Sequence, residues 1–261
     1  MDLVPVGRKR VAARAQRKAD TVAHDLLTRV VAGELPVGSI LPREADLAAK
    51  YDVNRSVVRE AVKLLEVHRL VEPTRRRGTE VLDPLRSLSP EVLRAMLRHD
   101  GRVDRKVLEG LLEVRAAIDV EMTTRAAARR TDDDLRALDA LVARVRTARA
   151  DEELEQVRRD LPVLIARATQ NPIFEMLAHW NDLVVRDLDD LFRWVRPIRE
   201  AYVQGIELLV ERIRARDVES IRGLVTTFHA WSAPRLLAAA ALSSGDPMPS
   251  GDPMPSQENA T

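Results

Sequence analysis

Hydrophobic and polar residues between positions 41 and 82 follow two different periods. From 43 to 51 and from 55 to 65, apolar residues recur every three or four positions, which predicts two short helices. Asp52 and Val53 separate these helices as a turn, and Asn54 is expected to cap the second one. Two β-type runs, 70–74 and 79–82, flank a glycine, which predicts a hairpin. This stretch should therefore form two helices and a small sheet.

The second predicted helix has one apolar and one basic face. Arg55 and Arg59, four residues apart, lie together opposite the apolar stripe. Two guanidinium groups on one helix face are suited to base edges or phosphates in the major groove of DNA, and Ser56 is short enough to lie between them. An ordinary solvated polar face is the alternative. If this face binds DNA, the predicted contacts lie on the two helices and the turn between them: Arg43, Asn54, Arg55, Ser56, Val57 and Arg59.

The predicted hairpin carries three consecutive arginines at its tip. Gly78 permits the tight reversal, and Arg75, Arg76, Arg77 and Thr79 surround it. Cationic side chains in this position reach the minor groove or the backbone of DNA. In isolation, three arginines in a loop would more often be solvated, so the assignment of these five residues to DNA depends on the elements around them.

Apolar positions before residue 41 extend the same unit, which we place at residues 20–82. Six apolar residues between 22 and 31 share one helical face, which predicts a helix over 20–32 with Gly33 as its stop. Residues 1–19 hold six basic residues against one acid and are expected to be a flexible arm. The arm is either simply solvated or adds phosphate contacts to DNA.

Beyond residue 82 the pattern is helical almost throughout. Residues 83–103 are expected to be a linker and a first connecting helix. Residues 104–235 should form a series of helices, which makes the fold mainly α. Residues 236–261, rich in Pro, Gly and Ser, should be disordered. Helix-start signals occur at Ser89-Pro90, Asp104, Thr131 with Asp134, and Asn171-Pro172.

Composition and charge change this picture in two ways. Residues 1–82 contain sixteen Lys and Arg against eleven Asp and Glu, whereas the remainder contains 26 against 30, so the chain has a basic head and an acidic body. This polarity fits a protein whose head alone meets phosphates. Cysteine is absent and no apolar run is long enough to span a bilayer, so we expect a cytoplasmic protein without disulfides and without membrane contact.

Four motifs follow one another in the head: G-x-L-P-x-G-x-x-L-P from Gly33, E-x-x-L-A from Glu44, V-x-R-x-x-V-R-E-A-x-x-x-L from Val53, and R-R-x-G-T-x-V from Arg75. With these spacings intact, the head resembles the winged helix-turn-helix of the GntR family of bacterial transcription regulators. The resemblance implies that residues 75–79 are the wing, whose tip touches DNA in that family. Ala45 departs from the pattern, because some relatives have an arginine there, so we expect fewer base contacts.

Four further motifs lie in the body: LLEVRAAIDVEMTTRAAARR, DDDLRALDAL, RATQNP and ARDVESI. They resemble, more loosely, the all-helical ligand-binding domain (FCD type) of the FadR subgroup of that family. The resemblance implies that residues 104–235 form an antiparallel bundle of six or seven helices that dimerises and encloses an effector pocket. Members of the subgroup commonly hold a divalent metal there with one Asp and three His, and the metal grips a carboxylate effector.

The metal pattern fails in this chain. The corresponding positions carry no metal ligand: they are Arg158, Pro162, Ile206 and Phe228. His229 follows the last of them and is therefore about a hundred degrees around the helix. A non-standard site that pairs His179 or His229 with Asp160 or Asp182 is the alternative. We expect no metal and no cofactor.

A metal-free pocket still has candidate ligand contacts. Arg115 lies where the subgroup usually has an arginine facing the cavity, and a guanidinium suits a carboxylate or a phosphate. Trp180, Asn181, Arg186 and Trp194 offer bulk and polarity nearby, although the aromatic residues are alternatively core or dimer contacts. The expected effector is anionic, either a fatty acyl thioester or a small organic acid.

The sequence thus predicts a homodimeric transcription regulator that binds an inverted-repeat operator in double-stranded DNA under the control of a small effector. A repressor is favoured over an activator, because the resemblance to the family implies repression more often than activation. The alternative is a constitutive DNA-binding dimer whose helical domain has lost its ligand. An enzyme is not expected, because the chain offers no nucleophile with a paired base, no Gly-rich phosphate loop and no metal set.

Overall fold

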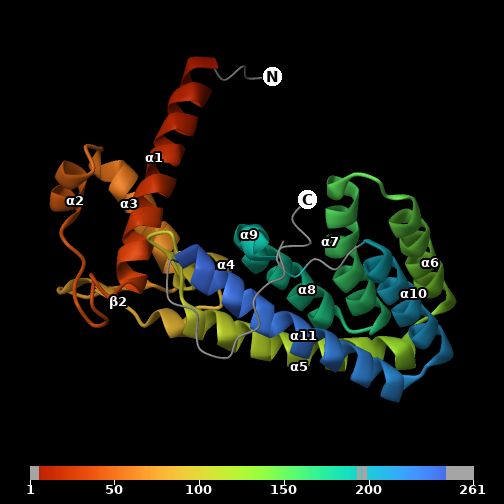
Figure 1. Ribbon diagram of the computed structural model, residues 1–261. Helices are drawn as coiled ribbons and strands as arrows, with labels where there is room; N and C mark the ends of the chain where they lie inside the picture. The colour runs from red at the N-terminus through yellow and green to blue at the C-terminus, as the bar shows by residue number, and fades with distance from the viewer. Residues whose placement is uncertain (1–5, 193–194, 196–198, 245–261) are drawn as a thin grey trace. The chain divides into compact units, whose positions relative to one another are not determined.

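The computed structural model describes residues 6–192, 195 and 199–244 (Figure 1). The chain divides into two compact units, Met1–Asp100 and Gly101–Thr261. Helices dominate both units, so the predicted mainly α fold is confirmed. In the part of the chain that the structure describes, no helix is long and apolar enough to cross a membrane.

The first unit combines helices with one hairpin. The two helices and the hairpin predicted between 41 and 82 are confirmed, with boundaries that differ by a residue or two. The elements in chain order are α1 (Val6–Val31), α2 (Glu44–Lys50), α3 (Arg55–Val67), β1 (Val71–Thr74), β2 (Gly78–Val81), the 3-10 turn η1 (Pro84–Arg86), α4 (Pro90–Leu97) and β3 (Arg98–His99).

Two boundaries of this unit differ from the predicted ones. Helix α1 begins at Val6 rather than near residue 20, so most of the predicted flexible arm is helical, and Ala19 is already buried. The residues before 20 are mainly Ala, Arg, Lys and Gln, which favour helix even without an apolar stripe. Helix α4 also belongs to this unit rather than to a linker, since Val92 and Ala95 are part of its core.

The core of the first unit lies among α1, α3 and α4. Leu26 of α1 and Val58, Ala61 and Leu65 of α3 are fully buried, and Leu70 continues this core toward the hairpin. Burying a large aliphatic side chain contributes roughly 1.5–3 kcal/mol. These contacts fix α3 against α1 by its apolar face, so the opposite face of α3 is left at the surface.

The hairpin is tied to the segment before α2. β1 and β2 are antiparallel, with Val71 opposite Val81. Gly38 N–H donates to the Val81 carbonyl and Val81 N–H donates to the Ser39 carbonyl, both at 2.8 Å. Leu41 N–H donates to the Thr79 carbonyl at the same distance. The proline- and glycine-containing bend therefore supports the hairpin along its second strand.

The second unit contains seven α-helices among its described residues, in agreement with the predicted six or seven. Its last helix continues to Ser244, beyond the predicted end of the bundle at 235, and residues 245–261 of the predicted tail lie outside the described residues. The elements are β4 (Arg102–Val103), α5 (Arg105–Arg129), α6 (Asp132–Thr147), α7 (Asp151–Ala168), α8 (Pro172–Val185), the 3-10 turn η2 (Arg186–Leu188), α9 (Asp189–Phe192), α10 (Arg199–Ala215) and α11 (Val218–Ser244).

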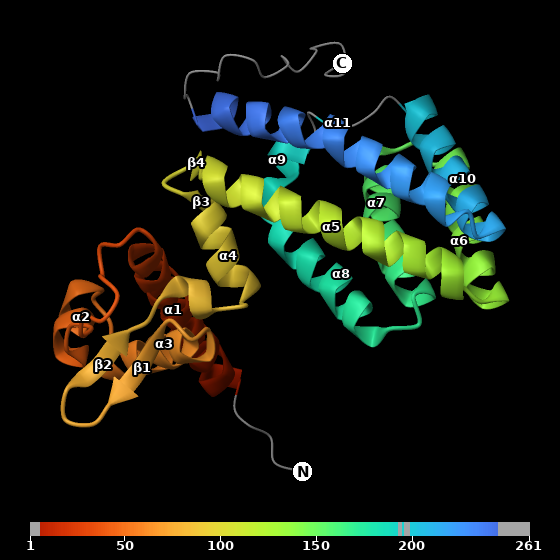
Figure 2. The same ribbon diagram turned by 90° about the horizontal axis from the view of Figure 1, so that it is seen from below.

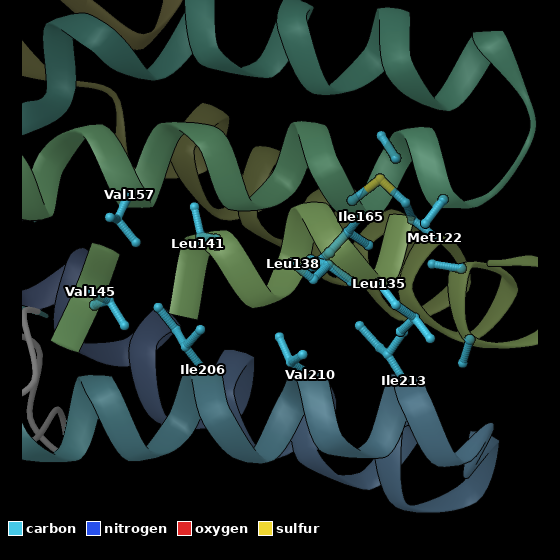
Figure 3. Close-up of a cluster of buried hydrophobic side chains, with 14 of the residues drawn as sticks. Met122, Leu135, Leu138, Leu141, Val145, Val157, Ile165, Ile206, Val210 and Ile213 are labelled. Atoms are coloured by element: carbon cyan, nitrogen blue, oxygen red, sulfur yellow. The ribbon is translucent and has the colours of Figure 1, made fainter. Parts of the chain in front are cut away.

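Helix α5 is the centre of this unit. It lies alongside α11 in two perpendicular views (Figures 1 and 2) and also packs against α7 and α10. Helix α6 packs against α7 and α10. In the core, Leu138 and Leu141 of α6 meet Ile165 of α7 and Val210 and Ile213 of α10, as Figure 3 shows.

Side-chain caps fix the starts of three of these helices. Asp104 accepts a hydrogen bond from Val107 N–H at 2.9 Å, and Asn171 accepts one from Ile173 N–H at 3.0 Å. Thr131 and Asp134 bond reciprocally to each other's backbone N–H groups as a capping box. These three predicted helix starts are confirmed, because each depends on a local hydrogen bond between a polar side chain and a backbone N–H group that has no partner within the helix.

Candidate functional sites

Helix α3 has one packed and one open face. Val58 and Leu65 are fully buried, whereas Arg55 and Ser56 are exposed and the Arg59 side chain is 63% exposed. Arg55 and Arg59 are about one turn apart, so both guanidinium groups lie on the open face. A helix needs this arrangement to enter a major groove of DNA while its other face stays in the protein core.

An acid of the preceding helix pairs with Arg59. Glu44, the first residue of α2, accepts a hydrogen bond at 2.8 Å from Arg59 Nε. Both partners are largely exposed, so the pair contributes at most about 1 kcal/mol. The pair engages Nε, so it restrains the direction of the guanidinium. Sequence reasoning missed this contact, although both residues stand in the motifs that it singled out.

The start of α3 is organised by backbone groups. Asn54 occupies the predicted N-cap position with extended backbone, but its side chain makes no capping hydrogen bond. Its carbonyl instead accepts from the N–H groups of Val57 and Val58. The exposed Asn54 amide therefore lies beside Arg55 and Ser56 and is open to a partner. The first turn of a helix favours phosphate, because its N–H groups carry partial positive charge.

Two other predicted DNA contacts differ in their surroundings. Val57 is only 7% exposed, because it lies next to Val58 and one turn from Ala61 on the packed side of α3. It therefore offers almost no surface to DNA, and the prediction that it is a contact is corrected. Arg43 is exposed and directly precedes Glu44 at the start of α2.

The tip of the hairpin presents its three arginines to solvent. Arg75, Arg76 and Arg77 are exposed, and Arg76 (φ +64°) and Gly78 (φ +111°) have positive φ angles that make the reversal. Thr79 is half-buried, and its carbonyl anchors the hairpin to Leu41. The three arginines are therefore free to contact an anionic partner. Gly78 and Thr79 contribute by shaping and anchoring the loop that carries them.

A small pocket of about 50 Å³ lies in the second unit between α5, α7 and α8. Pro162 of α7, at a position where the resemblance places a metal ligand, forms part of its wall. Of the predicted effector contacts, Arg115, Trp180 and Asn181 line the pocket. The wall is otherwise largely apolar and includes Leu111, Ile118, Met122, Leu177 and Ala178.

Arg115 takes part in a charged cluster in the wall of this pocket. Its Nε lies 3.5 Å from Asp119 Oδ2, without hydrogen-bond geometry, and is otherwise buried without a hydrogen-bond partner. His229 of α11 is buried, and its Nε2 lies 3.0 Å from the same Asp119 oxygen. The Arg115 guanidinium lies against the Phe192 ring, 5.6 Å from its centroid. No local pattern in the sequence predicts this Asp119–His229 pair, whose members are 110 residues apart.

Arg186, another predicted effector contact, is not among the described residues of the pocket wall. Arg186 is exposed and binds Asp182 within one turn of helix, with Nη2 at 2.7 Å from the carboxylate. That ion pair raises the pKa of Arg186. The prediction for Arg186 is corrected accordingly. Trp194 lies outside the described residues.

The positions of the implied metal ligands have other roles. The Arg158 guanidinium lies over the Tyr202 ring, 5.0 Å from its centroid, and burial raises the pKa of Tyr202 to about 12. Ile206 is part of the hydrophobic core, and Phe228 is half-exposed. Within the described residues, no group of three His, Cys, Asp or Glu is placed to hold a metal ion.

The alternative metal site is also not formed. His179 is exposed, and His229 pairs with Asp119 instead of Asp160 or Asp182. Asp160 accepts a hydrogen bond from Arg144 at 2.7 Å, and Asp182 is the partner of Arg186. The residues of this pocket therefore do not fit a metal, and what they offer a ligand is a guanidinium in an apolar wall.

Two family models match consecutive parts of the chain. The model of the bacterial regulatory proteins of the gntR family matches residues 18–81, and the model of the FCD domain matches residues 110–228. Rv0494 of Mycobacterium tuberculosis, an HTH-type transcriptional regulator described as uncharacterized, is 32% identical over 167 residues, which are 63% of this chain and 67% of that protein. The chain belongs to the GntR family. Its winged helix-turn-helix is α2, α3 and the β1–β2 wing, and its FCD domain is helical.

Other GntR relatives extend the comparison. The galactonate operon transcriptional repressor of Escherichia coli is 29% identical over 167 residues, covering 62% of this chain and 71% of the repressor. The solved structure of Lar, described as controlling the expression of the Listeria monocytogenes agr system, has a TM-score of 0.56 at 18% identity. It covers 84% of this chain and 95% of its own, so the two chains share a fold.

Proposed function

We propose that this GntR protein is a homodimeric repressor of the FadR subgroup that binds an inverted-repeat operator and releases it when a small acidic effector occupies the FCD domain. The observation that carries the DNA-binding part is the open face of α3. Arg55, Ser56 and Arg59 share this face, and the opposite face is packed against the core through Val58, Ala61 and Leu65. A bacterial operator lies in the cytoplasm, so the proposal assigns the protein to that compartment.

Recognition of the operator is assigned to α3 and its surroundings, and non-specific contacts to the wing. Arg55 and Arg59 are the proposed base contacts, since a guanidinium fork matches the O6 and N7 acceptors of guanine. Asn54 and Ser56 supply shorter polar contacts at the start of the helix, and Arg43 is placed to bind a neighbouring phosphate. The wing arginines, 75–77, are proposed to bind the backbone or the minor groove.

The repressor and dimer assignments have separate supports. The Escherichia coli relative is named as a transcriptional repressor and the Mycobacterium tuberculosis relative as a transcriptional regulator, and these names also disfavour an enzyme. A helix-turn-helix recognises a palindromic site when two copies are related by a two-fold axis. Effector control is supported by the FCD match and by the Arg115-containing pocket.

The test of DNA recognition compares two exposed cations of α3. Arg59→Ala should weaken binding to the specific operator by about 1–3 kcal/mol, while binding to random DNA changes much less. Lys63→Ala is the matched control, because Lys63 is equally exposed on the same helix, one turn further on, and pairs with Glu60. Fluorescence anisotropy with both DNAs at one salt concentration measures the difference. Equal losses on both DNAs would show that Arg59 contacts phosphate only.

A second candidate function is favoured by the small size of the pocket, about 50 Å³. On this alternative the chain is a constitutive DNA-binding dimer whose FCD domain binds no ligand. Thermal-shift measurements with organic acids, acyl-CoAs and divalent metals separate the two functions. A ligand at a hundred times its Kd raises stability by about 2.7 kcal/mol, so a regulator shows a clear shift with one class. Unchanged Tm values with every class support the constitutive protein.

A further inference from the structure

We propose that the effector is a small apolar monocarboxylate, whose carboxylate binds Arg115 and whose hydrocarbon part fills the pocket between α5, α7 and α8. The inference rests on the proposed function, because it specifies the ligand of the pocket that is assigned there to the effector. It decides between the two anionic ligands that the sequence leaves open, a small organic acid and an acyl thioester.

The charges of the pocket wall favour a ligand with one negative charge. Among the described residues that line the pocket, Arg115 is the only cation, and Asp119 is the only acid. A first carboxylate is attracted to the Arg115 guanidinium, whose Nε lies 3.5 Å from Asp119 Oδ2. A second carboxylate in so small a space would approach Asp119, and like charges repel strongly where apolar walls exclude water. Dicarboxylates and tricarboxylates are therefore disfavoured.

The hydrogen-bonding capacity of Arg115 is largely unused. A guanidinium has five N–H donors in a planar fork, and the buried Nε has no hydrogen-bond partner. A planar carboxylate matches this fork through two parallel hydrogen bonds. Asp119 pairs with His229, whose Nε2 lies 3.0 Å from its carboxylate. The same carboxylate is 3.5 Å from Arg115 Nε without hydrogen-bond geometry, so the guanidinium keeps N–H groups for a ligand. Asn181 lines the same wall and offers an amide to the ligand.

Size and polarity exclude larger and more polar acids. A water molecule requires about 10–15 Å³ of such space, so a pocket of about 50 Å³ has room for roughly four non-hydrogen atoms, enough for the hydrocarbon part of butanoate but not for that of a much longer acid. The surroundings of the hydrocarbon part are Leu111, Ile118, Met122 and Leu177. Hydroxyl groups of a sugar acid would lie against these side chains without partners, which is unfavourable. The nucleotide part of an acyl-CoA is too large for this space and would have to lie outside it.

A matched series of four-carbon ligands tests this assignment on the full-length protein. Butanoate, succinate, threonate and butanoyl-CoA differ by a second carboxylate, by hydroxyl groups and by the thioester. Isothermal titration at one pH and ionic strength should show butanoate binding at least tenfold more tightly than each of the others. Equal or tighter binding of succinate, threonate or butanoyl-CoA overturns the ligand class, and so does the absence of butanoate binding at millimolar concentration.

Variants of α5 test which residue binds the carboxylate. Arg115→Gln should weaken butanoate binding at least tenfold, whereas the control Arg125→Gln should leave it unchanged. Arg125 is on the same helix but is exposed, pairs with Glu121 and does not line the pocket. If Arg115→Gln folds poorly, Arg115→Lys retains the charge without the fork and should still weaken binding severalfold. Unchanged butanoate affinity in a folded Arg115 variant overturns the proposal.

One further variant and one parallel measurement complete the test. Asp119→Asn removes the negative charge from the wall, so it should narrow the preference for butanoate over succinate at least threefold, and an unchanged ratio contradicts the charge argument. Operator binding is measured on the same samples without ligand. If operator binding is intact while butanoate does not bind, the ligand class is wrong and the DNA-binding function stands. If the operator is not bound either, the proposed function itself fails.

Discussion

Gly78 at the base of the wing tip is predicted to be a position where one methyl group is costly. Its φ of +111° is disfavoured for any L-residue, at roughly 1–3 kcal/mol. A Cβ atom there would lie 2.8 Å from Cγ2 of Ile40, which forces a shift with an overpacking cost of about 1–3 kcal/mol. Gly78→Ala should therefore destabilise the wing by roughly 2–6 kcal/mol, and the three arginines at its tip should lose their fixed positions.

Hydrogen exchange at the amides of Gly38, Leu41 and Val81 measures this effect, because their hydrogen bonds tie the wing to the preceding segment. Gly78→Ala should speed exchange at all three and weaken operator binding. Gly33→Ala is the control, since its φ is also positive (+77°) but its added Cβ meets no atom within 4 Å.

The two causes are separated by a double variant. Ile40→Ala removes the Cγ2 atom that the new methyl group would meet, so it should restore part of the protection lost in Gly78→Ala. Exchange in Gly78→Ala that matches the wild type would refute the reasoning, and protection that Ile40→Ala does not improve would refute its packing part.

Two further predictions concern stability. Asp134 is buried and accepts three hydrogen bonds, so Asp134→Ala should lower the free energy of unfolding of the FCD domain by about 2–4 kcal/mol in urea titrations. Asp133 lies in the same first turn but is exposed, so the control Asp133→Ala should lower it by under about 0.5 kcal/mol. Similar losses in the two variants would contradict the capping argument. Burial alone would raise the pKa of Glu91, but hydrogen bonds from Ser89 and from its own backbone outweigh it and lower the pKa. Because the pKa of Glu91 is lower in the folded than in the unfolded protein, ionised Glu91 stabilises the fold above its unfolded pKa of about 4.3, and this stabilisation is lost as pH falls through the folded pKa. Ser89→Ala should therefore make the free energy of unfolding less dependent on pH between about pH 5 and 3. An identical pH profile for Ser89→Ala would contradict it.

Local signals made most of the fold predictable. The capping box of Thr131 and Asp134, the Asn171-Pro172 start and the glycine of the wing each act within a few residues, so the sequence alone reveals them. The open face of α3 was predictable for the same reason, because its period is set by the helix itself. On this helix only Val57 was assigned to the wrong face: it was predicted to contact DNA but is buried. It lies at the edge of the apolar stripe, where a small rotation of the helix decides whether a residue is exposed or buried.

Contacts between distant parts of the chain were not predictable. Glu44 and Arg59 belong to different helices, and Asp119 and His229 meet only because α5 lies along α11. Periodicity places a residue on a face of its own helix but does not state which residue of another helix faces it. The length of α1 was missed for a different reason, since its first part is helical through intrinsic propensity without an apolar stripe.

The most direct test of the central claim, that the open face of α3 recognises a specific operator, is the ratio of two affinities. Competition titrations at about 150 mM salt compare a fragment of the protein's own promoter region with random DNA of equal length. The promoter fragment is expected to bind about a thousandfold or more tightly than random DNA, as specific sites do. Equal affinity for the two DNAs would contradict it.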